Sequence, residues 1–452
     1  MLGIDTYLVG GYVRDVLLGR HCNDIDIMSV GKGLDLAEKV AKRLQLADKL
    51  VVYKNFGTAL IHHENLEIEF VGARKESYRA NSRKPIVEDG SLEDDLSRRD
   101  FTINALAVKL NQKDFGKMID LFDGLTHLQH GLLKTPLDPD ITYSDDPLRM
   151  MRAIRFATQL HFRIDDNSLA AISANAERIK IVSSERIADE LNKIILALRP
   201  SIGFSMLSET GLLRHIFPEM EELKGVEYIK GKGHKDNFWH TLQVLDNVAT
   251  QSSNLWLRWA SILHDIAKPA TKKFEPIVGW TFHGHEELGA RMVPRIFRKL
   301  SLPLNDKMKY VQKLVKLHLR PIALVKEEIT DSAIRRLLFE AGDDIDDLML
   351  LCSADITSKN EEKVKRYIKN FQLVQTKLQE VEEKDRIRNF QPPVTGELIM
   401  QTFGIGPCRE IGILKNSVKD AILDGLIEND PQQAFQYMLS LAEQFGLKPI
   451  QP

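Results

Sequence analysis

The sequence predicts an α+β protein in which a mixed α/β unit is followed by a helical remainder. Strand-like and helix-like apolar patterns alternate up to about residue 135. From about residue 136 onward, nearly every segment has the apolar period of a helix and a composition rich in Leu, Ala, Glu and Lys. Because the chain has 452 residues, it is too long for a single core.

These changes of pattern divide the chain into four parts. Three prolines between residues 136 and 147 mark a linker after the mixed unit. We expect an α/β head at residues 1–135, an all-helical neck at 136–200, a connector with a helical body at 201–370, and a helical tail at 371–452.

Composition and charge are those of an ordinary globular protein. The formal net charge of −2 argues against a generally basic surface, so any nucleic-acid binding must use local patches. Cys22, Cys352 and Cys408 are scattered without a disulfide or CxxC pattern, which predicts a cytoplasmic location. No apolar run is long enough to span a membrane, so we expect no membrane partner, and composition does not predict the oligomeric state.

The most informative stretch lies near the start of the chain. An apolar strand ends at Gly10-Gly11, and a helix bearing Arg14 follows. A second strand carries Asp24 and Asp26, whose side chains point the same way because strand side chains alternate between faces. Paired carboxylates suit Mg²⁺, and glycines at a helix start let a phosphate approach the backbone. The alternative is a glycine turn before an ordinary acidic strand.

A second motif, from Arg98 to Ala105, reads RRDFTINA. Together with GGYVRDVLLG and DIDI, it resembles the motifs of the class II tRNA nucleotidyltransferase and bacterial poly(A) polymerase family, within the DNA-polymerase-β superfamily. The resemblance implies a polymerase-β-like nucleotidyltransferase head. It also implies that Arg98 and Arg99 contact phosphate or ribose, and that Asp100 and Asn104 contact the sugar.

The chemistry of this motif agrees with the implied role. Arginine forks match phosphate oxygens bidentately, and a carboxylate accepts a hydrogen bond from a ribose hydroxyl. The alternative for the RRD run is a solvated cluster of charges.

A third motif, SDDPLRMMRAIRF at residues 144–156, predicts a helix with Asp146 and Arg149 on one face. The carboxylate would accept from the exocyclic amine of cytosine or adenine, and the guanidinium would donate to the ring nitrogen. Guanine and uracil present the reverse order, so the pair would select CTP and ATP. The family gives this role to its EDxxR motif, although Asp145 replaces the glutamate here. The alternative is an i,i+3 ion pair within the helix.

Two further arginines, Arg152 and Arg155, repeat the basic face of that helix and complete the predicted nucleotide-binding set. In the neck, the segment SERI resembles another family motif, and Ser184 is the expected N-cap of its helix.

Two segments near the aspartate strand have weaker assignments. The charged stretch Arg74–Asp95 has no apolar period and predicts a mobile loop, which the resemblance associates with the change from CTP to ATP. The strand before it carries Glu67 and Glu69, one of which would be a third metal carboxylate. The alternative is a solvated glutamate on an edge strand.

A second constellation of metal-ligating side chains lies in the helical body. In chain order it consists of His240, His264, Asp265, His285, His318 and Asp355. The order H…HD…H…H…D resembles that of HD-type phosphohydrolase domains. Imidazole and carboxylate ligands suit a transition metal (Ni, Mn, Co, Fe or Zn) that activates water. His283 is a weaker ligand candidate than its neighbour, and the alternative is a set of unrelated core and surface histidines.

The tail carries a glycine turn, Gly404-Ile405-Gly406-Pro407, ahead of a helical pattern. It predicts either a phosphate-approach turn in a tRNA-binding tail or a plain helix–turn–helix.

Taken together, the motifs predict an enzyme that adds C, C and A to tRNA 3′ ends from CTP and ATP without a nucleic-acid template. Asp24 and Asp26 would be the catalytic carboxylates that hold Mg²⁺, and pyrophosphate would leave. The alternatives are a poly(A) polymerase or an A-adding enzyme. In another class, an HD-type metal-dependent phosphodiesterase or phosphatase would be the main activity.

Overall fold

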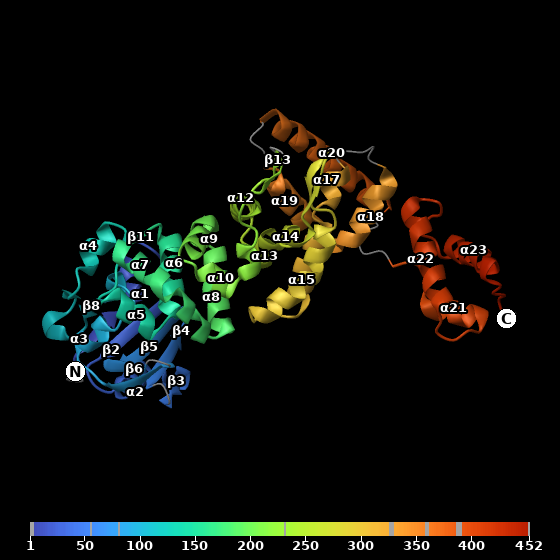
Figure 1. Cartoon of the computed structure of the whole chain (residues 1–452). Coiled ribbons are helices and arrows are strands. Elements are labelled where there is room, and N and C mark those ends of the chain that lie inside the picture. Colours follow the sequence, from blue (N-terminus) through green and yellow to red (C-terminus); the bar gives the residue numbers. More distant parts are fainter. Residues whose placement is uncertain are drawn as a thin grey trace. The chain divides into compact units, whose positions relative to one another are not determined.

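A computed structural model describes residues 4–54, 57–79, 82–229, 232–324, 330–357, 361–385 and 391–450. The chain forms two compact units (Figure 1). The first contains residues 1–224 with 299–302, and the second contains residues 225–298 with 303–452. The α+β class predicted from the sequence is confirmed, whereas the division into four parts stays a prediction.

The first unit begins with a seven-stranded mixed sheet, in the order β3-β4-β5-β2-β1-β8-β9. Strand β2 pairs antiparallel with β1 and parallel with β5, so it lies near the centre of the sheet. The strands are β1 (Thr6–Val9), β2 (Asp24–Ser29), β3 (Leu50–Tyr53), β4 (Thr58–His63), β5 (Leu66–Gly72), β8 (Leu106–Lys109) and β9 (Met118–Asp120).

Helices pack on this sheet through small and branched apolar side chains. The core beneath α2 (Gly33–Leu44) contains Leu36, Ala37 and Phe70, all buried. Burial of such side chains is the main stabilising term for the head. The other helices of this part are α1 (Gly11–Leu17), α3 (Leu92–Ser97) and α4 (Gly124–Gln129).

The prediction of a mobile loop at Arg74–Asp95 is wrong. Most of the segment forms an antiparallel hairpin of β6 (Arg74–Arg79) and β7 (Ser82–Asp89), and helix α3 follows. Backbone hydrogen bonds pair the two strands, and such pairing does not require an apolar face. A hairpin with a charged sequence therefore has no apolar period from which it could be predicted.

The rest of the first unit is helical, as expected, apart from a short parallel pair of β10 (Leu132–Leu133) with β11 (Arg163–Ile164). Helix α6 packs against α8 and α9. The helices are α5 (Pro139–Asp145), α6 (Leu148–Leu160), α7 (Asp166–Asn175), α8 (Ser184–Ile195), α9 (Pro200–Glu209), α10 (Leu212–Ile216) and α11 (Pro218–Glu221).

Two details of this region differ from the sequence predictions. The single helix predicted across residues 144–156 is broken, because α5 ends at Asp145 and α6 begins at Leu148. Pro147 explains the break, since the residue before a proline is driven out of the helical region, and Asp146 has an extended backbone. The N-cap of α8 is Ser183, one residue before the predicted Ser184.

The second unit is built around buried aromatic residues of its helices, including Trp259 and Phe297 with ring centres 6.3 Å apart. Two hairpins interrupt the helices: β12 (Tyr228–Ile229) with β13 (Lys232–Gly233), and β14 (Lys273–Glu275) with β15 (Gly279–Thr281). The helices are α12 (Asn237–Ala249), α13 (Leu255–Leu263), α14 (Lys268–Thr271), α15 (His285–Lys299), α16 (Asp306–Leu317), α17 (Arg320–Leu324), α18 (Asp331–Ala341), α19 (Ile345–Asp355) and α20 (Glu361–Asp385).

The chain continues with α21 (Gly396–Phe403), α22 (Arg409–Asp424) and α23 (Pro431–Ala442). Gly404 ends α21 in the left-handed conformation, with φ of 64°, and α22 follows after a short turn. The helix–turn–helix is thus present, while phosphate binding at the turn stays a prediction. Among the described residues, no helix combines the length and the apolarity needed to cross a bilayer.

Candidate functional site

A cavity of about 470 Å³ in the first unit brings most of the predicted nucleotide site together. Its predicted lining residues are Gly10, Gly11, Arg14, Asp24, Asp26, Arg99, Asp100, Asn104, Arg152 and Arg155. Three other predicted residues, Arg98, Asp146 and Arg149, do not line it. Arg99, Asp100 and Asn104, far from the aspartate strand in sequence, reach the cavity because β8, which follows them, pairs with β1.

Four carboxylates lie on one face of two neighbouring strands. Asp24 and Asp26 of β2 stand opposite Glu67 and Glu69 of β5 in a parallel register. Strand β5 lies between β4 and β2, so the edge-strand alternative for the glutamates is wrong. Both glutamates line the cavity beside the aspartates, and Glu67 is exposed whereas Glu69 is half-buried.

The electrostatics of this face favour a cation. Burial raises the pKa of Asp26 to about 6, Arg99 opposes the shift, and the neighbouring carboxylates of Glu69 and Asp24 add to it. A carboxylate whose pKa is raised by burial and by acidic neighbours is stabilised in its charged form by a divalent cation. The donor set therefore fits Mg²⁺, which prefers one or two carboxylates together with phosphate oxygens.

Gly10 permits a close approach of side chains to the β1–α1 turn. Its backbone has φ of 79° and ψ of −144°, a conformation that residues with a Cβ avoid. A Cβ placed there would lie 2.8 Å from Asp26 Oδ2 and 2.9 Å from Arg99 Nη1. The glycine was predicted for phosphate approach, but its nearest neighbours in the structure are a carboxylate and a guanidinium.

Asp100 is the hub of a buried hydrogen-bond network. Its Oδ1 accepts from Asn104 Nδ2 at 2.9 Å, and its Oδ2 accepts from Arg152 Nε at 2.8 Å. Arg14 Nη1 donates to Asn104 Oδ1 at 2.7 Å and holds Asp15 with its other nitrogens. Burial acts to raise the pKa of Asp100, but Arg152 and Asn104 hold it well below its usual range. Arg14 is therefore engaged within the protein, where it fixes the orientation of Asn104.

Asp95 is a positioning residue that sequence reasoning missed. Its carboxylate is fully buried, accepts from Arg98 Nε at 3.1 Å and accepts from Arg99 Nη2 at 3.0 Å. Arg98 also pairs with Glu76 of the hairpin at 3.0 Å, so it is turned away from the cavity. The sequence did contain a signal for these ion pairs, because Asp95 precedes the two arginines by three and four residues, the spacings at which helical side chains meet.

Phe156 is a second residue that the prediction missed. The guanidinium carbons of Arg155, Arg14 and Arg152 lie 3.9, 4.7 and 5.4 Å from the centre of its ring. Glu190 of α8 accepts from Arg155 Nε at 2.6 Å. Stacking on an aromatic face holds arginine side chains in place at the wall of the cavity.

Asp146 and Arg149 do not form the ion pair that was the alternative to base reading. The side chain of Asp146 accepts from the backbone N–H of Leu148 at 3.2 Å and lies 3.9 Å from Arg186 Nη2. Arg149 Nη2 donates to the backbone carbonyl of Arg98 at 2.6 Å. Base recognition by this pair stays a prediction.

In the second unit, all six residues of the second constellation converge. Asp265 is central: its Oδ2 lies 3.2 Å from His264 Nε2, and its Oδ1 lies 3.2 Å from His285 Nε2 and 3.9 Å from His318 Nε2. His240 Nε2 lies 2.7 Å from Asp355 Oδ1. The ligand atoms of all of these residues except Asp355 form two overlapping groups that share Asp265, an arrangement that suits one or two metal ions. His283 is exposed and lies outside both groups.

The imidazoles are oriented as metal ligands. The Nδ1 atoms of His264, His285 and His318 each lie 2.7 Å from a backbone carbonyl oxygen three residues earlier, to which Nδ1–H donates. Their Nε2 atoms are buried, and none has a hydrogen-bond partner among the described residues. Such an Nδ1 contact fixes the tautomer that presents Nε2 to a metal.

The centre of the cluster is electrostatically negative. Burial acts to lower the pKa of His264, but the carboxylates of Asp265 and Asp355 more than offset this and raise it to about 10. Lys268 Nζ lies 2.5 Å from Asp265 Oδ2, and Lys235 Nζ lies 2.8 Å from His240 Nδ1. These lysines place positive charge at the edge of a site whose centre attracts cations.

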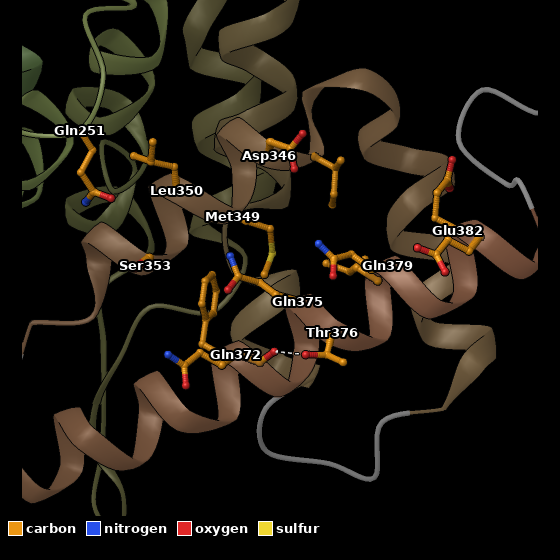
Figure 2. Close-up of a pocket in the computed structure, with 14 residues that line it drawn as sticks. Gln251, Asp346, Met349, Leu350, Ser353, Gln372, Gln375, Thr376, Gln379 and Glu382 are labelled. Atoms are coloured by element: carbon orange, nitrogen blue, oxygen red, sulfur yellow. Dashed lines mark hydrogen bonds between the residues drawn. The ribbon is translucent and has the colours of Figure 1, made fainter.

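A larger cavity of about 950 Å³ lies between α19 and α20 (Figure 2). Its walls carry Gln372, Gln375 and Gln379 together with Asp346 and Glu382. No lysine, arginine or histidine is among its described lining residues, so it does not suit a phosphate. None of the predicted site residues lies there.

Comparison with known proteins matches three regions of the chain to family models. The Poly A polymerase head domain matches residues 6–134, a probable RNA and SrmB-binding site of polymerase A matches residues 161–224, and the HD domain matches residues 237–341. The A-adding tRNA nucleotidyltransferase of Deinococcus radiodurans is 30% identical over 365 residues, which cover 78% of this chain and 80% of that protein. The chain belongs to the tRNA nucleotidyltransferase family.

Other members of the tRNA nucleotidyltransferase family match shorter regions. The CCA-adding enzyme of Levilactobacillus brevis is 37% identical over 215 residues, which cover 47% of this chain and 52% of that protein. The A-adding enzyme of Aquifex aeolicus is 38% identical over 194 residues, which cover 43% of this chain but only 23% of that protein. The chain thus matches about half or less of the length of these two relatives.

Solved structures support the fold. The Thermotoga maritima CCA-adding enzyme complexed with tRNA has a TM-score of 0.59 at 21% identity, and the alignment covers 97% of this chain and 92% of that one. A CCA-adding enzyme in complex with ATP has a TM-score of 0.63 at 22% identity, with coverage of 97% and 92%. At this identity the likeness concerns the fold alone.

Proposed function

We propose that the chain adds C, C and A to the 3′ ends of tRNA, taking CTP and ATP as substrates and using no nucleic-acid template. The observation that carries the proposal is the cavity where the carboxylates of β2 face Arg99, Asp100 and Arg152. It supplies acidic groups for a metal and basic groups for a triphosphate at one place. The substrates come from the relatives, which are named for CCA or A addition.

Asp24 and Asp26 would hold Mg²⁺, with Glu69 beside them. The ion supplies a lowered pKa for the attacking 3′-hydroxyl and charge stabilisation for the departing pyrophosphate. Arg99, which donates to Asp95 and lies beside Asp26 at the Gly10 turn, would bind triphosphate oxygens next to the carboxylates. Arg152 and Asp100 both line the cavity and are joined by a hydrogen bond, so a sugar hydroxyl that binds there would meet an ordered network.

Base selection is proposed for Asp146 and Arg149. In the structure Asp146 lies in the break between α5 and α6, Arg149 lies in the first turn of α6, and neither side chain is neutralised by the other. The carboxylate retains acceptor capacity for an exocyclic amine, and the guanidinium retains donors for a ring nitrogen. Both cytosine and adenine present that pattern.

The proposal is tested by Asp26→Ala in a nucleotide-incorporation assay with labelled CTP or ATP. We expect incorporation to fall by orders of magnitude, because positioning and charge stabilisation supply most of the catalysis of phosphoryl transfer. Asp35→Ala on α2 is the matched control, since Asp35 is exposed and outside the cavity. Near-normal incorporation by a folded Asp26→Ala protein would contradict the metal assignment.

The second candidate function is addition of the terminal A alone. It is favoured by the relatives from Deinococcus radiodurans and Aquifex aeolicus, both named as A-adding. The base-reading pair suits C and A equally, so the sequence does not separate this candidate from CCA addition or from poly(A) synthesis. Two tRNA substrates, one lacking CCA and one ending in CC, separate A addition from CCA addition. An A-adding enzyme extends only the tRNA that ends in CC, whereas a CCA-adding enzyme extends both.

For the second unit we propose a metal-dependent phosphohydrolase activity that is separate from addition. Its support is the convergence of five candidate ligands in two overlapping groups, with Asp355 beside His240, and the three Nε2 atoms that make no hydrogen bond among the described residues. Imidazole-rich sites favour Ni, Mn, Co, Fe or Zn over Mg²⁺. Metal analysis of the purified protein, followed by an assay with bis-p-nitrophenyl phosphate, tests it. The absence of both bound metal and turnover would contradict it.

A cytoplasmic location stays a prediction from the scattered cysteines.

A further inference from the structure

Four aromatic rings form a cluster beside the ligands of the second unit. Phe274 of β14 stands opposite Trp280 of β15, with ring centres 5.3 Å apart. His234, which follows β13, has its ring centre 5.5 Å from that of Trp280 and 5.8 Å from that of Phe282. All of these contacts are edge-to-face, and each of the four rings is only half-buried. The cluster therefore keeps apolar surface that a planar ligand can cover.

The aromatic cluster and the metal-ligand cluster are joined on two sides. On one side, the backbone carbonyl of Phe282 is the Nδ1 contact of His285. Lys268 bridges the same pair, because its Nζ lies 2.5 Å from Asp265 Oδ2 and 5.7 Å from the centre of the Phe282 ring. On the other side, Lys235 directly follows His234 and contacts His240 Nδ1. The rings thus adjoin the ligands through Phe282, Lys268 and Lys235.

The charges around the rings favour an anionic ligand. Lys235 is exposed and contacts His240, whereas Lys268 is half-buried and lies between the Phe282 ring and Asp265. Lys272 Nζ lies 4.5 Å from the centre of the Trp280 ring and pairs with Glu227 at 2.8 Å. Aromatic faces interleaved with lysines are the usual platform for a nucleobase and its phosphate.

We propose that His234, Phe274, Trp280 and Phe282 form a nucleobase-binding subsite, with Lys235 and Lys268 binding the adjoining phosphate. The substrate class of the second unit would then be nucleotides, either free or at the 3′ end of an RNA, rather than simple phosphate esters. The inference rests on the proposed phosphohydrolase activity. It adds residues that distinguish substrates and take no part in holding the metal.

The test compares two cyclic phosphodiesters, of which one carries a nucleoside and the other does not. Both 2′,3′-cyclic AMP and glycerol 1,2-cyclic phosphate contain the same five-membered phosphodiester ring, but only the first has a ribose ring and a base. We expect Trp280→Ala to raise KM for 2′,3′-cyclic AMP roughly fivefold or more, as loss of one stacking contact would. Its kinetics with glycerol cyclic phosphate should stay unchanged, and Trp280→Phe should restore most of the KM.

Two further measurements complete the test. Val278→Ala, at the exposed tip of the same hairpin, controls for disturbance of β14 and β15 and should alter neither substrate's kinetics. Quenching of tryptophan fluorescence by AMP gives a readout without turnover, and the quenching should be lost in Trp280→Ala. Parallel assays with 2′,3′-cyclic AMP and with an RNA that ends in a 2′,3′-cyclic phosphate show which source of nucleotide is used.

The outcomes separate this inference from the activity on which it rests. Wild-type protein that hydrolyses both cyclic phosphates equally well, with Trp280→Ala changing neither, would overturn the subsite and leave the phosphohydrolase intact. Wild-type protein that binds AMP but hydrolyses neither compound would overturn the phosphohydrolase and leave the subsite intact. Absence of both AMP quenching and base preference would overturn the inference.

Discussion

Replacement of Gly10 by alanine tests how the first cavity is built. The new Cβ would lie 2.8 Å from Asp26 Oδ2 and 2.9 Å from Arg99 Nη1, closer than carbon approaches such atoms. Both side chains would have to move by about 0.5 Å or more, which is the tolerance of a preorganised site. The backbone conformation of Gly10 would add about 1–3 kcal/mol of strain.

Two effects should follow, and they can be measured separately. The strain should lower the free energy of unfolding by about 1–3 kcal/mol, measured by urea denaturation. The displacement of Asp26 and Arg99 should lower kcat for nucleotide addition by roughly 10-fold to 100-fold, since a shift of about 1 Å at a reacting centre costs about that much. Nucleotide addition is assayed at saturating tRNA and triphosphate.

Gly19→Ala is the matched control. Gly19 also has a positive φ, 66°, but a Cβ there would meet no atom within 4 Å. We expect this variant to lose stability and to keep its kcat. If Gly10→Ala retained the kcat of the control, the reasoning about the carboxylate and the guanidinium at the turn would be refuted.

The remaining predictions concern both units. Asp95→Ala should lower kcat/KM and stability together, because it leaves Arg98 and Arg99 without their buried partner, whose loss costs about 3–5 kcal/mol; a folded variant with unchanged kinetics would exclude a positioning role. Asp146→Ala should raise incorporation of GTP and UTP relative to CTP, since an acceptor contact contributes about 1–3 kcal/mol of base discrimination, and unchanged preference would count against base reading. Replacing His264 and Asp265 together by alanine should abolish metal binding and phosphoester hydrolysis, measured by elemental analysis and turnover, while nucleotide addition survives; loss of both activities in a folded protein would contradict separate sites.

Features encoded in short sequence patterns could be predicted. Asp24 and Asp26 share a face because the strand period is two, and the structure confirms the strand, the turn and the helix around them. The order of the histidines and of Asp265 predicted a cluster, and the structure brings these residues together. Both predictions rest on local geometry or on a motif that is unlikely to arise by chance.

Features that depend on tertiary contacts could not be predicted. The parallel register that sets Glu69 opposite Asp26 joins two strands far apart in sequence, and no local pattern encodes it. The packing of three guanidinium groups around Phe156 depends on how α1 and α6 meet. The break at Pro147 could have been predicted, because a proline disfavours a helical conformation in the residue before it. The helical apolar period of the neighbouring residues instead led to the prediction of one helix.

The central claim is tested most directly by incubating the purified protein and Mg²⁺ with tRNA that lacks CCA and with tRNA that ends in CC. Each triphosphate is supplied singly, CTP and ATP are also supplied together, and the 3′ ends are sequenced. The account predicts addition of C, C and A to the first tRNA only when both substrates are present, and addition of A to the second with ATP alone. Extension of the second tRNA only would contradict CCA addition and establish the A-adding function, and no extension of either would contradict nucleotidyl transfer to tRNA.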